Sequence, residues 1–241
     1  MNQKKKIKEI YKKVETVDDF DNERERYLYQ KYKHMIESGF LKKNMLKISK
    51  KEINVLDVAC GTGRMLPEIF SLNKKINYTG VDSSTKMTGV LIRKAKVLKV
   101  NKNVRVINSD ASKMPFKGNS FDLVFSYHLL WHLPKKDQKK VIKEMARVTK
   151  PNGIFIFDFL NRDFYWNSLK RYVKINETDG IYKLGRNEAI EIANGEVLGI
   201  ERICDAQIKN PVLYSIFNLV NRLRFFLPWK MFHMAYLSSR K

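Results

Sequence analysis

Short apolar runs alternate with helical periodicity through the middle of the chain. The first run, Ile53–Ala59, leads into a turn that carries two glycines, and a helical pattern follows from Met65 to about Leu72. This order predicts a buried parallel strand, a glycine turn, and a helix whose N-terminus faces a ligand. Glycine suits such a turn because it permits close backbone approach and positive φ angles.

The same alternation continues for another hundred residues. Four further strands are predicted, at Ile76–Val81, Val104–Asn108, Phe121–Ser126 and Ile154–Phe159. Helices are predicted between them, from a cap at Ser84 or Thr85 to about Val97, and over Lys136–Val148. Strands that alternate with helices indicate a parallel sheet covered on both faces. Ligands of such sheets bind at the carboxyl ends of the strands, near the point where strand order reverses.

The two ends of the chain are less regular. A basic helix is predicted at Lys4–Val14, and a second helix at Asp21–Ile36 with Gly39 as its C-terminal stop. After residue 161 the pattern predicts a helix, a strand, an amphipathic helix and a last strand, at Arg186–Ala193, Val197–Ile208, Pro211–Phe226 and Phe232–Ser238. We find no internal repeat and no linker-like segment, so one domain over residues 1–241 is predicted.

Composition narrows the class of protein. An apolar fraction of 44% and an aromatic fraction of 12% favour a globular protein. Cys60 and Cys204 cannot build a disulfide framework, and residues 1–13 are lysine-rich with no apolar run behind them. We therefore expect a cytoplasmic protein without a signal peptide.

The net charge of +22 has two interpretations. It can serve a polyanionic partner, either RNA or an anionic membrane surface. It can also be a solvated, lysine-rich surface, and lysine outnumbers arginine, the residue used for bidentate recognition.

A glycine turn of this kind can bind a dinucleotide or another adenosine-containing ligand, and two acidic residues help to distinguish them. A dinucleotide site would have a third glycine, but Leu66 stands three positions after Gly63. Asp82 ends the second strand, 19 residues after Gly63, where a carboxylate can accept both hydroxyls of an adenosine ribose. Asp110 ends the third strand and can receive the amino group of an adenine or cap a turn.

Five segments in this order resemble the motifs of class I S-adenosylmethionine-dependent methyltransferases. They are Asp57–Gly63, Gly80–Ser84 with Met87, Asp110–Ala111 followed by Met114–Phe116, Asn119–Val124 and Lys150–Gly153. The resemblance covers residues 53–160. It implies an α/β fold: a Rossmann-like, doubly wound, mostly parallel seven-stranded sheet with helices on both faces. Residues 1–50 would form an N-terminal helical cap, 51–160 the cofactor-binding core, and 161–241 the substrate side, with a helical insertion before the last strand.

The resemblance also implies S-adenosyl-L-methionine as the cofactor and a role for each matching position. The glycine turn would lie against the amino-acid part of the cofactor, with Asp57 near its ammonium. Asp82 would hold the ribose hydroxyls, and Ser126 would lie close to the reactive methyl group. The complete set of implied cofactor-binding residues is Asp57, Ala59, Gly61, Thr62, Gly63, Asp82, Ser83, Met87, Asp110, Ala111 and Ser126.

Methyl transfer from a sulfonium is an in-line displacement, in which a general base is optional. His128 and His132 are four residues apart, so a helix after the fourth strand would put both on one face. Either histidine is a candidate general base, and packing beside Trp131 is the alternative role. No third ligand for a metal ion accompanies this pair, so no metal site is predicted.

These patterns predict a methyltransferase that acts on an oxygen or nitrogen of a small-molecule acceptor. Residues 126–129 differ from the Asp/Asn-Pro-Pro-aromatic run of enzymes that methylate exocyclic base amines. A tRNA or rRNA methyltransferase is the alternative that the charge supports, and a non-catalytic S-adenosylmethionine-binding protein is another. Peripheral membrane contact through residues 211–230 is a further interpretation, and no obligate protein partner is expected.

Overall fold

The computed structural model describes residues 28–163, 182–203, 219, 221–223, 226, 228, 229, 232 and 234–241. The helix expected at Lys4–Val14 lies outside the described residues, as does most of the amphipathic helix expected at Pro211–Phe226. Among the helices that are described, none has the length and apolar character needed to cross a membrane.

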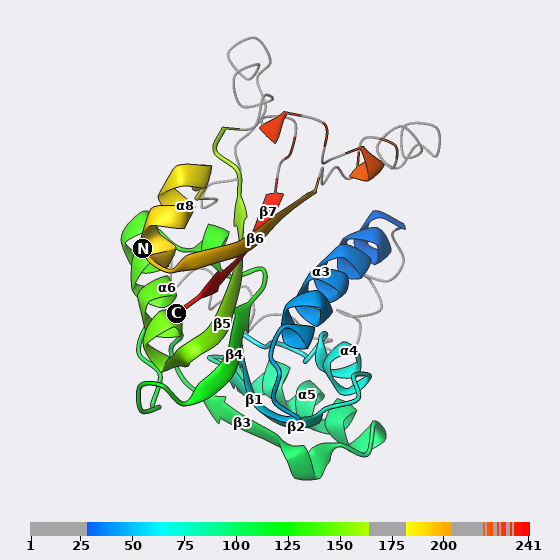
Figure 1. The fold of residues 1–241 in the computed structure, drawn as a ribbon. Coiled ribbons are helices and arrows are strands. Elements are labelled where there is room, and N and C mark those ends of the chain that lie inside the picture. Colours follow the sequence, from blue (N-terminus) through cyan, green and yellow to red (C-terminus); the bar gives the residue numbers. More distant parts are fainter. Residues whose placement is uncertain are drawn as a thin grey trace.

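Seven strands form one sheet in the order β3-β2-β1-β4-β5-β7-β6 (Figure 1). The strands are β1 (Glu52–Val58), β2 (Lys75–Asp82), β3 (Val104–Asn108), β4 (Phe121–Ser126), β5 (Thr149–Leu160), β6 (Glu196–Ile203) and β7 (Met234–Arg240). Strand β7 runs antiparallel to both of its neighbours, and the other neighbouring pairs are parallel. The order reverses between β1 and β4, which opens a crevice at the carboxyl ends of these two strands. The expected doubly wound, mostly parallel sheet is confirmed.

Helices cover both faces of the sheet (Figure 1). They are α3 (Leu28–Leu46), α4 (Leu66–Phe70), α5 (Thr85–Val97), α6 (Lys135–Val148) and α8 (Arg186–Ala193), with short 3₁₀ turns η1 (Asn101–Asn103) and η2 (Leu130–His132). Ser84 caps α5 by accepting a hydrogen bond from the Met87 amide at 3.4 Å, as its sequence position predicts.

Alternate residues of the central strands pack in two separate apolar cores, one on each face of the sheet. Val55 of β1 and Ile156 of β5 pack in the core beneath α3, α4 and α5. Leu56 and Phe157, one position along in each strand, pack in the core beneath α6 and α8. Successive strand residues point to opposite faces, so a strand buried on both faces must be apolar throughout. This explains the continuous apolar runs in the sequence.

Helix α3 corrects one expectation. Gly39 does not stop the helix, which continues to Leu46. Leu41 and Met45, beyond the glycine, are fully buried, whereas Gly39 is exposed. Burial of such side chains is worth roughly 1.5–3 kcal/mol each and outweighs the ~1 kcal/mol cost of one helical glycine.

We predict that Gly39→Ala stabilises the protein by about 0.5–1 kcal/mol, because a Cβ at this position meets no atom within 4 Å and the glycine cost is removed. Urea unfolding measures the change. The matched control is Gly80→Ala in β2, whose Cβ would lie 2.8 Å from the Cys60 sulfur, so this variant should be less stable than wild type. A loss of stability in Gly39→Ala would contradict the account of α3.

Candidate functional site

A cavity of about 520 Å³ lies at the carboxyl edge of β1, β2 and β4. Three turns line it: the turn after β1, the turn after β2, and the segment after β4. The lining residues include Asp57, 59–62, 82–87, Phe125, 127–129 and His132. This volume is in the usual range of roughly 300–1,000 Å³ for small-molecule sites.

The two glycines of the first turn have different functions. Both have positive φ angles, 53° at Gly61 and 71° at Gly63. A Cβ on Gly61 would meet nothing within 4 Å, so this part of the cavity wall is open. A Cβ on Gly63 would lie 2.7 Å from Leu91 Cγ, so Gly63 permits close packing against α5 instead. Gly63 was expected at the cofactor, but it does not line the cavity.

Asp82 joins the first two turns. One carboxyl oxygen accepts a hydrogen bond from the Gly61 amide at 2.9 Å, and the other accepts one from the Ser84 amide at 2.8 Å. Burial raises the pKa of this carboxyl, and the amide donors partly oppose the rise. Asp82 therefore shapes the glycine turn and also presents a carboxylate to the cavity.

Asp57 is a buried acid at the base of the same cavity. It accepts a hydrogen bond from the Tyr78 hydroxyl at 2.8 Å. Burial raises its pKa to about 7, and nearby Asp82 adds to the rise. No lysine or arginine of the described residues forms an ion pair with it. A cationic group in the cavity would favour its ionised form.

The other residues of the implied cofactor set divide into two groups. Ala59, Thr62, Ser83 and Met87 line the cavity, whereas Asp110, Ala111 and Ser126 do not. Asp110 is exposed and accepts hydrogen bonds from the amide and the hydroxyl of Ser112, which is its alternative role as a turn cap.

Ser126 differs from its expected position beside the reacting group. Its hydroxyl is fully buried and donates to the Val58 carbonyl at 2.9 Å. Phe125 and Tyr127, its neighbours in the chain, line the cavity instead. Strand alternation places consecutive side chains on opposite faces, and Ser126 has the wrong parity for the cavity.

The segment after β4 corrects the expectation for the two histidines. The chain does not continue as an α-helix: His128 has φ 64°, and only the short turn η2 follows. The two imidazoles therefore do not share a helix face, although both line the cavity. His132 Nε2 accepts a hydrogen bond from the indole N–H of Trp131 at 3.0 Å, the packing role considered as its alternative.

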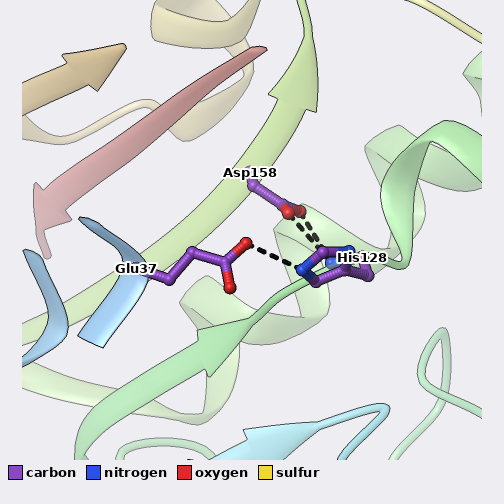
Figure 2. Close-up of side chains that lie close together, drawn as sticks. All are labelled: Glu37, His128 and Asp158. Atoms are coloured by element: carbon purple, nitrogen blue, oxygen red, sulfur yellow. Dashed lines mark hydrogen bonds and ion pairs between the residues drawn. The ribbon is translucent and has the colours of Figure 1, made fainter. Parts of the chain in front are cut away.

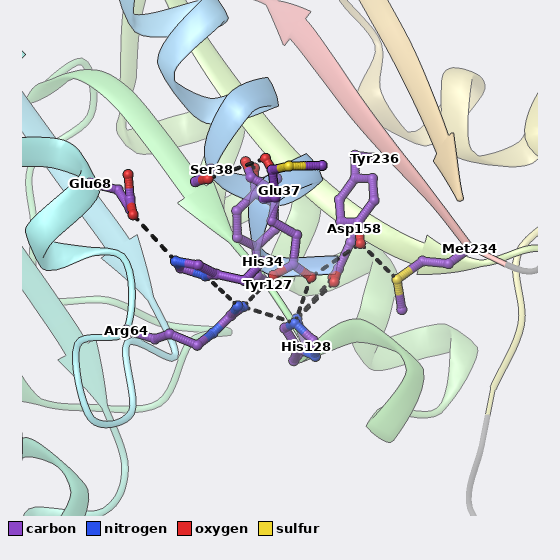
Figure 3. Close-up of polar contacts among 11 residues, drawn as sticks. His34, Glu37, Ser38, Arg64, Glu68, Tyr127, His128, Asp158, Met234 and Tyr236 are labelled. Atoms are coloured by element: carbon purple, nitrogen blue, oxygen red, sulfur yellow. Dashed lines mark hydrogen bonds and ion pairs between the residues drawn. The ribbon is translucent and has the colours of Figure 1, made fainter. Parts of the chain in front are cut away.

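His128 meets a cluster of polar side chains that joins four parts of the fold (Figure 3). Its Nε2 lies 2.7 Å from Oε1 of Glu37 on α3, and its backbone amide donates to both carboxyl oxygens of Asp158 on β5. The second oxygen of Glu37 forms an ion pair with Arg64 at 2.5 Å. The Tyr236 hydroxyl of β7 donates to Glu37 at 3.1 Å.

Glu37 is the functional candidate that the sequence patterns missed. It is fully buried, and it stands on the same helical stripe as Phe40 and Leu41, three and four residues later. A charged residue inside an apolar stripe is the signal that would have identified it.

The titratable side chains of this cluster have different charge states at neutral pH. Burial alone would raise the pKa of Glu37, but Arg64 and His128 hold it well below its usual range. Burial lowers the pKa of His128 well below its usual value. Burial raises the pKa of Asp158 to about 8, with help from the charge on Glu37. At neutral pH, Glu37 and Arg64 are charged while His128 and Asp158 are neutral.

Comparisons with known proteins agree with this architecture. Residues 56–157 match the family model described as "Methyltransferase domain". The chain is 31% identical over 199 residues to the uncharacterized protein MJ1252 of Methanocaldococcus jannaschii, covering 81% of this chain and 68% of that protein. It is 28% identical over 195 residues to the sterol 24-C-methyltransferase erg6 of Aspergillus fumigatus, covering 77% of this chain and 50% of that protein.

A solved structure has a similar fold. The PH0226 protein from Pyrococcus horikoshii superposes with a TM-score of 0.59 at 22% identity, over 96% of this chain and 98% of that chain. The chain spans half the length or less of seven of the curated relatives that it matches.

We predict that Asp158→Asn flattens the dependence of stability on pH between about pH 6.5 and 8. In this window the folded wild type keeps a proton on Asp158 that the unfolded chain has lost, so its free energy of unfolding falls as pH rises. One carboxyl group contributes up to about 1.4 kcal/mol per pH unit to the slope of the free energy of unfolding, and Asp158→Asn removes that contribution.

Urea unfolding across this pH range measures the slope. Asp163→Asn is the control, because Asp163 is exposed and its replacement should leave the slope unchanged. Equal slopes for wild type and Asp158→Asn would show that Asp158 ionises normally in the fold.

Proposed function

Since the chain belongs to the class I S-adenosylmethionine-dependent methyltransferases, we propose that it transfers the methyl group of S-adenosylmethionine to an oxygen or nitrogen of a small-molecule acceptor. The observation that carries the proposal is one continuous cavity, in which Asp57, Gly61 and Asp82 face the segment at Tyr127 and His128. A cofactor bound at the motif residues would direct its reactive end toward polar groups that can meet an acceptor.

The residues of the first two turns fit this cofactor. The wall at Gly61 is open, and the carboxylate of Asp82 is held in place by two amides, suited to a ribose diol. Asp57, whose pKa is raised to about 7, would gain from the cofactor's ammonium. When bound, the cofactor supplies a methyl group already activated by its sulfonium. The chain therefore has to bind, orient and exclude water.

The acceptor side of the cavity is mixed in polarity. Leu129 and Leu133 give apolar walls, while Tyr127, His128 and His132 add a few polar atoms. Apolar walls with a few polar groups suit a small, largely apolar acceptor that carries one polar function. The name of the erg6 relative, a sterol 24-C-methyltransferase, supports a small apolar acceptor as well, although with carbon as the methylated atom.

A second candidate follows from the net charge of +22. A basic surface favours a polyanionic partner, so tRNA or rRNA methylation is the alternative. The same charge could also hold the protein on an anionic membrane surface, close to an apolar acceptor.

We propose a cytoplasmic location, because the free thiol of Cys60 suits a reducing compartment.

Incubation with methyl-labelled S-adenosylmethionine separates these candidates. The acceptors would be phenols, carboxylic acids, amines, a sterol and total tRNA. Label in a phenol, acid or amine supports the proposal, label in the sterol alone indicates a carbon acceptor, and label in tRNA supports the alternative. Cofactor binding without transfer to these compounds or to any fraction of cell extract would indicate a non-catalytic binding protein.

We predict that Asp82→Ala weakens S-adenosylmethionine binding by at least about tenfold, because it removes a charged hydrogen-bond acceptor worth roughly 1.5–3 kcal/mol. Isothermal calorimetry measures the affinity, and Asp137→Ala on α6 is the control, because Asp137 does not line the cavity. Unchanged affinity in folded Asp82→Ala would contradict the assignment of the second turn. Asp110→Ala, measured alongside, tests whether Asp110 reaches the adenine or only caps its own turn.

A further inference from the structure

Glu37 and Arg64 form a charged pair in a place where apolar residues could also pack. Glu37 is fully buried, and the Arg64 side chain is 22% exposed. A buried ion pair is seldom more stable than apolar residues of the same volume, because both charges lose their hydration. The pair meets at the cavity, on the ring of His128, so its position points to a role in the chemistry of the site.

The contact with Glu37 determines which nitrogen of His128 carries the proton (Figure 2). An ionised carboxylate only accepts hydrogen bonds, so the 2.7 Å contact with Glu37 calls for a proton on Nε2. Nη2 of Arg64, which can only donate, lies farther from Nε2, at 3.0 Å, and already has a partner in the second oxygen of Glu37, so we assign the hydrogen bond at Nε2 to the shorter contact. In the neutral imidazole, Nδ1 is then a lone-pair acceptor. Nδ1 makes no hydrogen bond within the described part of the chain, and the ring lines the cavity.

The ring is also held from its other sides. The His128 amide donates to Asp158 at 3.0 and 2.9 Å, which fixes the backbone at the strained φ of 64°. Trp131 packs edge-on at 5.1 Å between ring centroids. A base held in this way loses little entropy when the acceptor arrives.

On the basis of the proposed methyl transfer, we propose that Glu37 and His128 form an acid–base dyad, and that the acceptor is a neutral hydroxyl compound. The hydroxyl oxygen bonds to the methyl carbon while the carbon–sulfur bond breaks, and that bond's electron pair stays on sulfur. The hydroxyl proton moves to Nδ1 of His128 and passes later to water. His128 is the catalytic base, and Glu37 is a positioning residue that stabilises the imidazolium as it forms.

The surrounding charges suit this cycle. Lys33 and Glu37 of α3, Arg64 of the glycine turn and Asp158 of β5 face the ring. Burial is the main effect that lowers the pKa of His128, Lys33 and Arg64 add to it, and Glu37 opposes it, so the imidazole is neutral before the reaction. A hydroxyl needs a neutral base to take its proton as it attacks, whereas a neutral amine or a nucleophilic carbon attacks without one, so a base at this position favours a hydroxyl acceptor.

A metal ion is the competing use of the same atoms. Donor atoms of Glu37, His128 and Asp158 lie within 4.8 Å of one another. Arg64 disfavours it, because its guanidinium lies 2.5 Å from Glu37 and 3.0 Å from Nε2 of His128, where a cation would have to bind. The dyad therefore predicts transfer that is insensitive to a chelator such as EDTA.

Removal of the imidazole is the first test, with whichever phenol or other neutral hydroxyl compound the wild type methylates. Glycine accepts the φ of 64° at this position, so His128→Gly should fold and bind S-adenosylmethionine like wild type. We expect methyl transfer to fall at least about 100-fold, and added imidazole to restore part of it. His128→Asn, which also tolerates this φ, is the second variant if His128→Gly does not fold.

The second test does not depend on activity. In the cofactor-free wild type, ¹⁵N NMR of the His128 ring should show a proton on Nε2 and none on Nδ1 at neutral pH. Glu37→Gln should lower the pKa of His128 and slow transfer without changing the KM for the acceptor. Glu144→Gln on α6, an acid-to-amide change outside the cavity at a residue paired with Arg147, is the matched control and should change neither.

The outcomes separate the two proposals. A wild type that transfers no methyl group overturns the proposed function, whatever the NMR shows. Wild-type transfer in folded His128→Gly or His128→Asn, or a proton on Nδ1, overturns the dyad alone. Loss of transfer with EDTA, regained with a divalent ion, replaces the dyad with a metal site.

Discussion

The carboxylate of Glu37 has no contact with water. The groups that balance its negative charge also form one side of the site. A buried negative charge is tolerated only when opposite charge and hydrogen bonds replace its hydration. Arg64 supplies the charge, and His128 and Tyr236 supply the hydrogen bonds. These partners come from the glycine turn, the end of β4 and β7. One acid on α3 therefore fastens the N-terminal helix to the cavity and orients the imidazole that faces it.

The topology of the sheet brings these partners together. Strand order reverses between β1 and β4, so their carboxyl ends flank one crevice, with β2 beyond β1. The antiparallel strand β7 lies beside β5, and it carries Tyr236 into register with Asp158. Glu37 and Tyr236, 199 positions apart in the sequence, thus meet at 3.1 Å beside a sheet that is buried by apolar side chains on both faces.

Environment decides the state of each acid in the cavity region. Glu37, beside Arg64, is ionised despite full burial, whereas Asp57 and Asp158 lack an ion-pair partner among the described residues and have raised pKa values of about 7 and about 8. Asp82 is stabilised by backbone amides instead. A carboxyl group in this region is therefore an ion-pair partner at Glu37, a protonated acid near neutral pH at Asp158 and a hydrogen-bond acceptor for backbone amides at Asp82, according to its burial and neighbours.

Local pattern determined the central sheet, the two-sided cores and the positions of Asp57, Gly61 and Asp82. These follow from alternation, strand length and the spacing of turn residues, which are properties of short segments. Only the tertiary structure decided that α3 continues past Gly39, that Ser126 faces away from the cavity, and that His128 and His132 occupy different surroundings. It also brought Glu37 to His128 across ninety-one positions. Such features depend on packing and on the pairing of buried charge between distant elements, and neither is encoded in the periodicity of one segment.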